Sequence, residues 1–296
     1  MNKIIVITGP TGVGKTKLSI SLAKKYDGEI INADSMQIYK NLNIGTAKIC
    51  EEEKEGIVHH LLDIKDVNED YSIYDYQKDG RKAIKEILGK NKTPIIVGGT
   101  GLYIKALLYD YELKENVNKN EYESLSTEEL YNILLDLDKD SIDVIDKNNR
   151  RRIVNAINYY KENNKSITKN KTNKLLYDAI FIGLTTDREN LYQIINKRVD
   201  IMVKNGLINE VKSFYDKGIY TKPLTGGIGY KELYQYFKGN ISLEEAIDEI
   251  KKNSRHYAKR QYTFFNHQLP IVWFNTDYHS FNNTINEVYN YIDSIK

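Results

Sequence analysis

A glycine-rich stretch near the N-terminus has the residue types and the spacing of a phosphate-binding loop. Residues 9–16 have the sequence GPTGVGKT, which matches the pattern G-x-x-x-x-G-K-[ST]. Glycines let the backbone curl so that successive N–H groups point at one anion, at the positive end of the following helix. In this pattern the lysine, Lys15, reaches the terminal phosphates, and the hydroxyl of Thr16 binds Mg²⁺. The motif predicts a bound phosphate group but does not identify the reaction.

A second candidate is the carboxylate of Asp34, which follows an apolar run in the stretch NADSMQIY. The run predicts a strand beside the phosphate-binding loop, and ligands of parallel sheets bind beyond the carboxyl ends of the strands. Asp34 could therefore assist a bound Mg²⁺, or act as the general base toward a nucleophile that approaches the phosphate-bearing substrate. The plain alternative is a helix N-cap, because an aspartate between a strand and a helix commonly has that role.

The stretch PIIVGGTG lacks an acid that an ordinary P-loop ATPase needs. Such an ATPase carries a Mg²⁺-binding aspartate at the end of this strand, where the chain has Gly98 and Gly99. This counts against simple nucleotide hydrolysis, and the paired glycines indicate close approach of a ligand or a backbone. Thr100 could contact that ligand or cap the next helix. The adjacent His59 and His60 face opposite sides of a predicted strand, which favours a structural role over a shared metal.

Short apolar runs alternate with helical patterns over most of the chain. The runs that predict strands are Ile4–Thr8, Glu29–Ala33, His60–Ile64, Pro94–Val97, Ala179–Leu184 and Ile271–Phe274. Helical spacing marks Lys17–Lys25, Tyr74–Leu88, Leu102–Leu108 and several segments between Arg188 and Gln268. The alternation predicts an α/β fold with a mostly parallel sheet flanked by helices.

The alternation stops between Asp110 and Leu175, where the sequence is polar and helix-patterned. We expect residues 1–109 and 176–296 to form the α/β core with C-terminal helices, and residues 110–175 to form a small inserted all-helical domain. Within the insertion, residues 110–147 hold 12 acidic and 4 basic residues, and residues 148–175 hold 8 basic residues and 1 acidic residue. This segregation favours a polyanionic partner over a merely solvated face. The scarcity of apolar residues in 163–174 predicts a mobile loop.

The composition of the whole chain excludes several classes of protein. The 296 residues carry a net charge of +2 and a single cysteine, which excludes an internal disulfide and fits a reducing compartment. No run of 18 apolar residues is present, so we expect no membrane span. We expect a cytoplasmic monomer that needs no obligate protein partner.

Taken together, the motifs resemble one family, the bacterial tRNA dimethylallyltransferases. The resemblance covers nearly the whole chain and is carried by GPTGVGKT, NADSMQIYKNLNIGTAK, HHLLDI, DYSIYDYQKDG, GGTGLYIKAL, RVDIMVKNGLINEV, GIGYKEL and YAKRQYTFF. It implies a P-loop NTPase-like fold that holds the diphosphate of dimethylallyl diphosphate in place of ATP. The five-carbon group would pass to N6 of the adenosine at tRNA position 37, beside the anticodon, giving N6-(dimethylallyl)adenosine and diphosphate.

The resemblance also implies roles for individual residues. Asp34 would accept the proton of the attacking amine, while Arg198 and Thr100 would lie near the reacting centre and the diphosphate. Lys15, with Mg²⁺ on Thr16, would stabilise the leaving group. The diphosphate would bind the loop residues Gly9, Pro10, Thr11, Gly12, Val13, Gly14, Lys15 and Thr16. The tRNA would contact Asp34, Ser35, Met36, Gln37, Thr100, Arg150, Arg151, Arg152, Gly229, Tyr230, Lys231, Lys259 and Arg260, with the insertion gripping the anticodon stem.

The chain departs from the usual pattern of that family in the insertion and near the C-terminus. The departures are Lys139, Asn149, Asn155, Phe264 and Asn266. They bear on the tRNA contacts and leave the predicted catalytic residues unaffected. Two other functions fit part of the sequence. A small-molecule P-loop kinase would use Asp34 as the base toward a hydroxyl, and a non-catalytic nucleic-acid-binding protein would explain the basic segments but not Asp34 with GGTG.

Overall fold

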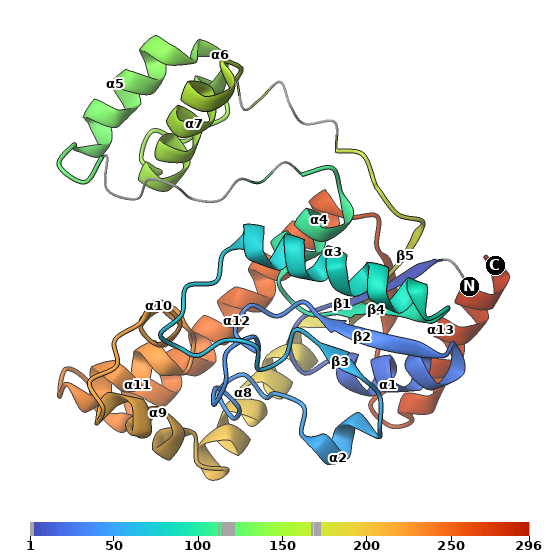
Figure 1. Ribbon diagram of the computed structural model, residues 1–296. Helices are drawn as coiled ribbons and strands as arrows, with labels where there is room; N and C mark the ends of the chain where they lie inside the picture. Colours follow the sequence, from blue (N-terminus) through green and yellow to red (C-terminus); the bar gives the residue numbers. More distant parts are fainter. Residues whose placement is uncertain (1–2, 112, 114–121, 167, 169–172, 296) are drawn as a thin grey trace. The chain divides into compact units, whose positions relative to one another are not determined.

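The computed structural model describes residues 3–111, 113, 122–166, 168 and 173–295 of the chain. Within it the chain forms two compact units (Figure 1). The core unit comprises Met1–Leu108 together with Leu176–Lys296, and the inserted unit comprises Tyr109–Leu175.

Among the described residues, six strands of the core unit form one sheet. They are β1 (Ile4–Thr8), β2 (Gly28–Asn32), β3 (His59–His60), β4 (Thr93–Val97), β5 (Ala179–Thr185) and β6 (Val272–Asn275). The order is β3-β2-β4-β1-β5-β6, and every neighbouring pair is parallel. Strand β1 therefore lies between β4 and β5, so the loop after β1 opens at the middle of the carboxyl edge of the sheet.

The two faces of the sheet are covered by different helices (Figure 1). On one face lie α1 (Lys15–Lys25) and α13 (Phe281–Ser294), whose apolar side chains join those of β1 and β5 in one buried cluster. On the other face lie α3 (Ile73–Gly89) and α4 (Gly101–Leu108). Because helices cover both faces, the central strands are buried and mostly apolar, as the run IIVIT of β1 illustrates.

A helical layer follows β5 and carries its own buried cluster. It consists of α8 (Arg188–Lys204), α9 (Leu207–Tyr215), α10 (Lys222–Gly226), α11 (Tyr230–Phe237) and α12 (Leu243–Gln268). The short helix α2 (Glu51–Lys54) lies between β2 and β3. Helix α12 contacts α4, α8 and α11, so side chains from the C-terminal half of the chain reach the carboxyl edge of the sheet.

The inserted unit is helical in its described residues. It consists of α5 (Thr127–Leu137), α6 (Lys139–Ile142) and α7 (Arg150–Asn163), and α5 and α7 pack on each other. Their apolar faces enclose a small core that includes Leu130, Leu134 and Ile153. Of the loop predicted over residues 163–174, residues 167 and 169–172 lie outside the described residues.

The α/β fold class with a parallel sheet is confirmed, and the predicted strand at His60–Ile64 is wrong. Only His59 and His60 form a strand there. Leu61 and Asp63 have φ of 61° and 53°, a left-handed conformation that turns the chain and ends the pairing with β2. No helix among the described residues is long and apolar enough to cross a membrane.

Candidate active site

The P-loop connects the end of β1 to the start of α1. Gly9, Gly12 and Gly14 have positive φ values of 138°, 87° and 93°. A Cβ on Gly9 would lie 2.4 Å from the carbonyl oxygen of Leu184 in β5, so this position also needs glycine for close approach. The loop ends at the N-terminus of α1, where unpaired N–H groups attract an anion. Of the other loop positions, Pro10 and Val13 are buried, Thr11 is half-buried and Thr16 is exposed.

Two cations from distant parts of the chain lie close to each other beside this loop. Lys15 Nζ donates to the carbonyl oxygens of Gly9 and Pro10 at 3.0 and 2.6 Å. Burial and the neighbouring Arg198 cation lower the pKa of Lys15 to about 7, and Asp34 partly offsets them. Burial also lowers the pKa of Arg198, and its buried Nε has no hydrogen-bond partner among the described residues. A buried, incompletely paired cation is costly unless an anion accompanies it.

Asp34 and Thr100 lie at the carboxyl ends of the neighbouring strands β2 and β4. Asp34 Oδ1 accepts from the backbone N–H of Met36 at 2.9 Å, which fixes the turn that follows β2. Thr100 Oγ1 accepts from the N–H of Ser35 at 3.1 Å. A Cβ on Gly98 would lie 2.2 Å from the backbone of Ala33. Gly98 thus serves a backbone approach that brings Thr100 to Ser35, whereas a Cβ on Gly99 would lie 2.2 Å from Gln261 Nε2.

Helix α12 adds two side chains that the motif analysis did not assign to the site. Gln261 Nε2 donates to the Gly99 carbonyl at 2.9 Å, while its buried Oε1 has no partner among the described residues. Burial and the nearby Asp34 carboxylate raise the pKa of Tyr257 to about 12, so its hydroxyl stays protonated beside the site. The run of basic and aromatic residues in YAKRQYTFF indicated that this helix takes part in binding. The sequence could not show which face of the helix meets the sheet.

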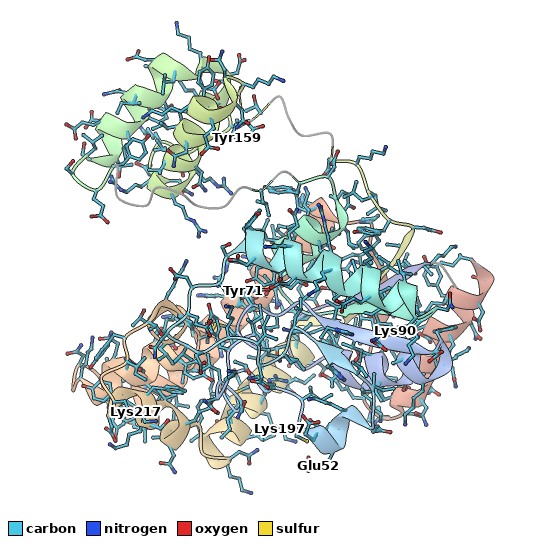
Figure 2. All side chains as sticks on the ribbon, viewed as in Figure 1. Glu52, Tyr71, Lys90, Tyr159, Lys197 and Lys217 are labelled. Atoms are coloured by element: carbon cyan, nitrogen blue, oxygen red, sulfur yellow. The ribbon has the colours of Figure 1, made fainter. Side chains whose placement is uncertain are left out.

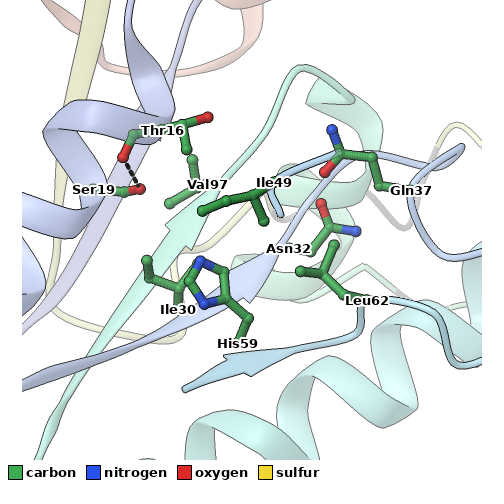
Figure 3. Close-up of a pocket in the computed structure, with 9 residues that line it drawn as sticks. All are labelled: Thr16, Ser19, Ile30, Asn32, Gln37, Ile49, His59, Leu62 and Val97. Carbon is green, nitrogen blue, oxygen red and sulfur yellow. Dashed lines mark hydrogen bonds between the residues drawn. The ribbon is translucent and has the colours of Figure 1, made fainter. Parts of the chain in front are cut away.

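A small cavity extends from the P-loop toward β2 and β3 (Figure 3). Its lining combines polar and apolar side chains: Thr16, Ser19, Ile30, Asn32, Gln37, Ile49, His59, Leu62 and Val97. In Figure 3, Thr16 and Gln37 lie on opposite sides of the cavity. Gln37 was predicted as a tRNA contact and Thr16 as a diphosphate contact, and the cavity brings both to one space.

The paired histidines bond to different partners. His60 Nε2 bonds with Glu29 Oε2 at 2.8 Å. Lys90, which is labelled in Figure 2, and Lys92 approach the same buried carboxylate at 3.0 and 3.2 Å. Although burial alone would raise it, these partners lower the pKa of Glu29 to about 2. His59 instead bonds to the carbonyl of Ile57 at 2.8 Å. No group of three potential metal-binding side chains occurs in the described part of the chain.

The predicted tRNA contacts on α11 and α12 differ in exposure. Lys259 and Arg260 are exposed, and the Arg260 guanidinium lies 5.6 Å from the centre of the Tyr257 ring. Tyr230 is fully buried, and its hydroxyl donates to Glu210 Oε1 at 2.6 Å. This placement argues against a tRNA contact by the Tyr230 side chain. Gly229 precedes α11 with a φ of 94°, and half-buried Lys231 lies 3.6 Å from Glu232.

The three arginines of the inserted unit are not equivalent. Arg150 donates from both terminal nitrogens to the carbonyl oxygens of Leu125 and Tyr122, each at 2.6 Å. This guanidinium therefore holds the segment before α5 against the start of α7. Arg151 and Arg152 are exposed at the first turn of α7.

Several departures from the family pattern have a structural role here. Asn149 is the N-cap of α7, since its Oδ1 accepts from the N–H of Arg152 at 3.2 Å. Phe264 packs against Gly101, and Asn266 Oδ1 accepts from Trp273 Nε1 at 3.0 Å. Lys139 and Asn155 are exposed, and nothing in the structure explains them.

Known proteins resemble this chain over almost its whole length. A family model described as IPP transferase matches residues 37–268. A tRNA dimethylallyltransferase of Anoxybacillus flavithermus is 49% identical over 98% of this chain and 96% of its own, and one of Geobacillus thermodenitrificans is 46% identical with the same coverage.

Two solved structures are also similar. A tRNA delta(2)-isopentenylpyrophosphate transferase of Staphylococcus epidermidis is 42% identical with a TM-score of 0.76, covering 99% of this chain and 100% of its own. A eukaryotic dimethylallyltransferase described as acting on tRNA is 31% identical with a TM-score of 0.83, covering 92% of this chain and 74% of its own.

Proposed function

We infer that this chain, which belongs to the IPP transferase family, transfers a dimethylallyl group to tRNA. Bacterial relatives named for this activity match it over almost the whole of both chains, and the kinase alternative is not favoured. We propose further that the donor is dimethylallyl diphosphate and that the acceptor is N6 of the adenosine at position 37, beside the anticodon.

The observation that carries the choice of donor is the pair of half-buried cations beside the P-loop. Burial and the Arg198 cation lower the pKa of Lys15, burial lowers that of Arg198, and Arg198 Nε has no partner among the described residues. A diphosphate on the loop would supply the missing anion. It would accept hydrogen bonds from the N–H groups at the start of α1 and from Arg198. The end of β4 has glycines where a nucleotide-hydrolysing enzyme has its aspartate, which suits a diphosphate that leaves intact.

The proposed reaction needs a leaving group and a base. The bond between the allylic carbon and the diphosphate oxygen breaks with its electron pair going to the oxygen, where Lys15 and Arg198 stabilise the growing charge. The adenosine N6 donates its lone pair to that carbon, and Asp34 takes the proton that the nitrogen releases. Asp34 is suited to this role because its carboxylate lies near both cations and its Oδ1 is held by the Met36 N–H.

The side chains beside the P-loop supply part of a Mg²⁺ site. Thr16 is the exposed hydroxyl at the start of α1, and the described residues hold no cluster of three carboxylate, histidine or cysteine side chains. The ion would therefore take the Thr16 hydroxyl together with water and diphosphate oxygens, as Mg²⁺ commonly does. When bound, it would neutralise charge on the leaving group.

We propose that the inserted unit binds the anticodon stem through Arg151 and Arg152, with Lys259 and Arg260 contributing from the core unit. All four side chains are exposed and cationic, and RNA backbones are bound mainly by such charges. The target base must leave its stack to reach Asp34, and a single-stranded anticodon loop makes this inexpensive. An enzyme with this substrate works where tRNA is found, and we propose a cytoplasmic monomer.

The test is to incubate the purified protein with Mg²⁺, labelled dimethylallyl diphosphate and unmodified tRNA, and then to analyse the nucleosides. We expect label in N6-(dimethylallyl)adenosine, and none when the adenosine at position 37 is replaced by guanosine. Heat stabilisation should be greater with dimethylallyl diphosphate than with ATP–Mg²⁺. The proposal would be refuted in favour of a kinase if the tRNA remained unlabelled and only ATP–Mg²⁺ stabilised the protein against heat.

A further inference from the structure

The side chain of Glu210 in α9 fills a site made by three consecutive backbone amides. Its Oε2 accepts from the N–H groups of Asn43 and Ile44 at 3.0 and 2.7 Å, and its Oε1 accepts from the N–H of Gly45 at 3.1 Å. Successive N–H groups that point at one oxygen pair form an anion-binding concavity. Here the anion is a carboxylate from the distant helix α9, so α9 holds the loop that follows the turn at Asp34.

The buried hydroxyl of Tyr230 orients this carboxylate. It donates to Glu210 Oε1 at 2.6 Å, and burial together with the carboxylate raises the pKa of Tyr230, so the proton stays on the hydroxyl. A Cβ on Gly45 would lie 2.6 Å from the Tyr230 ring. The loop therefore lies directly on the ring, and its position is set by α9 and α11 together.

The fixed loop in turn holds Gln37. Thr46 follows the last amide bound by Glu210, and its carbonyl accepts from Gln37 Nε2 at 3.1 Å. The turn is closed by Thr46 Oγ1, which donates to the Leu42 carbonyl at 2.6 Å. With Nε2 engaged in this way, the carboxamide of Gln37 has a set orientation at the cavity that also contains Thr16 (Figure 3).

We propose that Glu210 is a positioning residue for substrate recognition. It holds the amides of residues 43–45, which fixes the Thr46 carbonyl and through it the carboxamide of Gln37. This inference rests on the proposed function, in which Gln37 contacts the target adenosine. Both carboxylate oxygens of Glu210 accept from the loop amides, so its effect passes through the loop.

The test compares Glu210→Gln with Glu245→Gln in steady-state transfer assays. A glutamine at 210 has one acceptor oxygen instead of two and an NH₂ group that opposes the loop amides. We expect the KM for tRNA to rise about fivefold or more, as when a hydrogen bond to a charged group is lost, with the KM for dimethylallyl diphosphate unchanged. Glu245 caps α12 by accepting from the Ser242 N–H at 2.7 Å, so its variant controls for a general loss of stability.

A double-mutant cycle separates positioning from simple stabilisation. In a Gln37→Ala background, Glu210→Gln should change the KM for tRNA less than twofold, because the group it positions has been removed. Full additivity of the two substitutions would overturn the proposal, as would an equal effect of Glu245→Gln. Tyr230→Phe removes only the hydroxyl and should give a smaller change in the same direction, which keeps the test available if Glu210→Gln folds poorly.

Amide hydrogen exchange tests the link without any activity. Residues 43–45 should lose protection in Glu210→Gln and keep it in Glu245→Gln. Unchanged protection would refute the positioning role even if transfer were impaired. Failure of the wild-type protein to modify tRNA would instead refute the proposed function, and the exchange result would still decide whether Glu210 holds the loop.

Discussion

Raising the pH should weaken the binding of dimethylallyl diphosphate, because Lys15 is largely neutral in the free protein above neutral pH. Burial and Arg198 lower its pKa to about 7. A diphosphate on the P-loop favours the charged ammonium, so binding above this pH must include the uptake of a proton. Each further pH unit then lowers the affinity about tenfold, which corresponds to about 1.4 kcal/mol. From pH 7.5 to 9 the protonated fraction falls about 25-fold, and the affinity should fall with it.

The assay is isothermal titration calorimetry without tRNA, in pairs of buffers that differ in ionisation enthalpy. At pH 8 the wild-type protein should take up about 0.9 proton per ligand bound, as a group with a pKa near 7 that becomes fully charged does. Phosphate ester groups lose their last proton near a pH of about 6, so the ligand adds little over this range. Lys15→Arg is the matched control, because arginine stays charged and should take up no proton. If the affinity of the wild-type protein for dimethylallyl diphosphate did not change with pH and no proton were taken up, the reasoning on Lys15 would be refuted.

Three further predictions follow from single contacts. Asp34→Asn should keep the binding of both substrates and lower single-turnover transfer about 10²-fold or more, as loss of a positioned base does. Replacing Arg151 and Arg152 by alanine should flatten the dependence of log tRNA affinity on log salt by about 1.4 to 1.8 units. Arg150→Ala should mainly lower the melting temperature, because the two hydrogen bonds of Arg150 are internal to the protein. Gly98→Ala should destabilise the protein by about 2 kcal/mol or more in denaturant titrations, since the added Cβ would meet the Ala33 backbone. Gly89→Ala is the control and should not destabilise it, because a Cβ there meets nothing within 4 Å.

Each of these has a clear contrary outcome. Near-normal transfer by Asp34→Asn would remove that carboxylate from the mechanism. An unchanged salt slope would mean that Arg151 and Arg152 form a solvated face, and an equal loss of slope in Arg150→Ala would mean that its bonds to carbonyls break on tRNA binding. Equal stability of the two glycine variants would show that the β4–α4 turn can shift away from β2.

The parts of the site that the sequence predicted are those whose geometry is local. The phosphate loop needs only a strand, glycines and a helix in succession, so GPTGVGKT located it, and Asp34 followed because it ends the next strand. The predicted strand at HLLDI failed because left-handed φ at Leu61 and Asp63 is decided by packing, which an apolar run does not reveal. Alternating strands and helices were enough for the fold class, since that pattern leaves few other arrangements.

The parts of the site that the sequence did not predict depend on contacts between distant segments of the chain. The lowered pKa of Lys15 arises from burial and from Arg198, a residue that follows the inserted unit in the sequence. Likewise, no local spacing could have linked Glu210 with the amides of residues 43–45, or Gln261 with the Gly99 carbonyl. Arg198 was identified only through family resemblance, because one arginine in a charged helix carries no pattern of its own.

The position of β1 between β4 and β5 has a consequence for the order in which the protein is synthesised. Strand β1 ends at Thr8, but its second neighbour begins at Ala179. At about 5 to 20 residues per second, the ribosome needs roughly 10 to 35 s to make the chain between them. Both edges of β1 are open until β4 has been made, and one edge stays open until β5 follows. Exposed apolar edges invite pairing with other chains. A ribosome that stalls within the inserted unit would therefore leave a nascent chain prone to aggregation, with a phosphate loop but without Arg198.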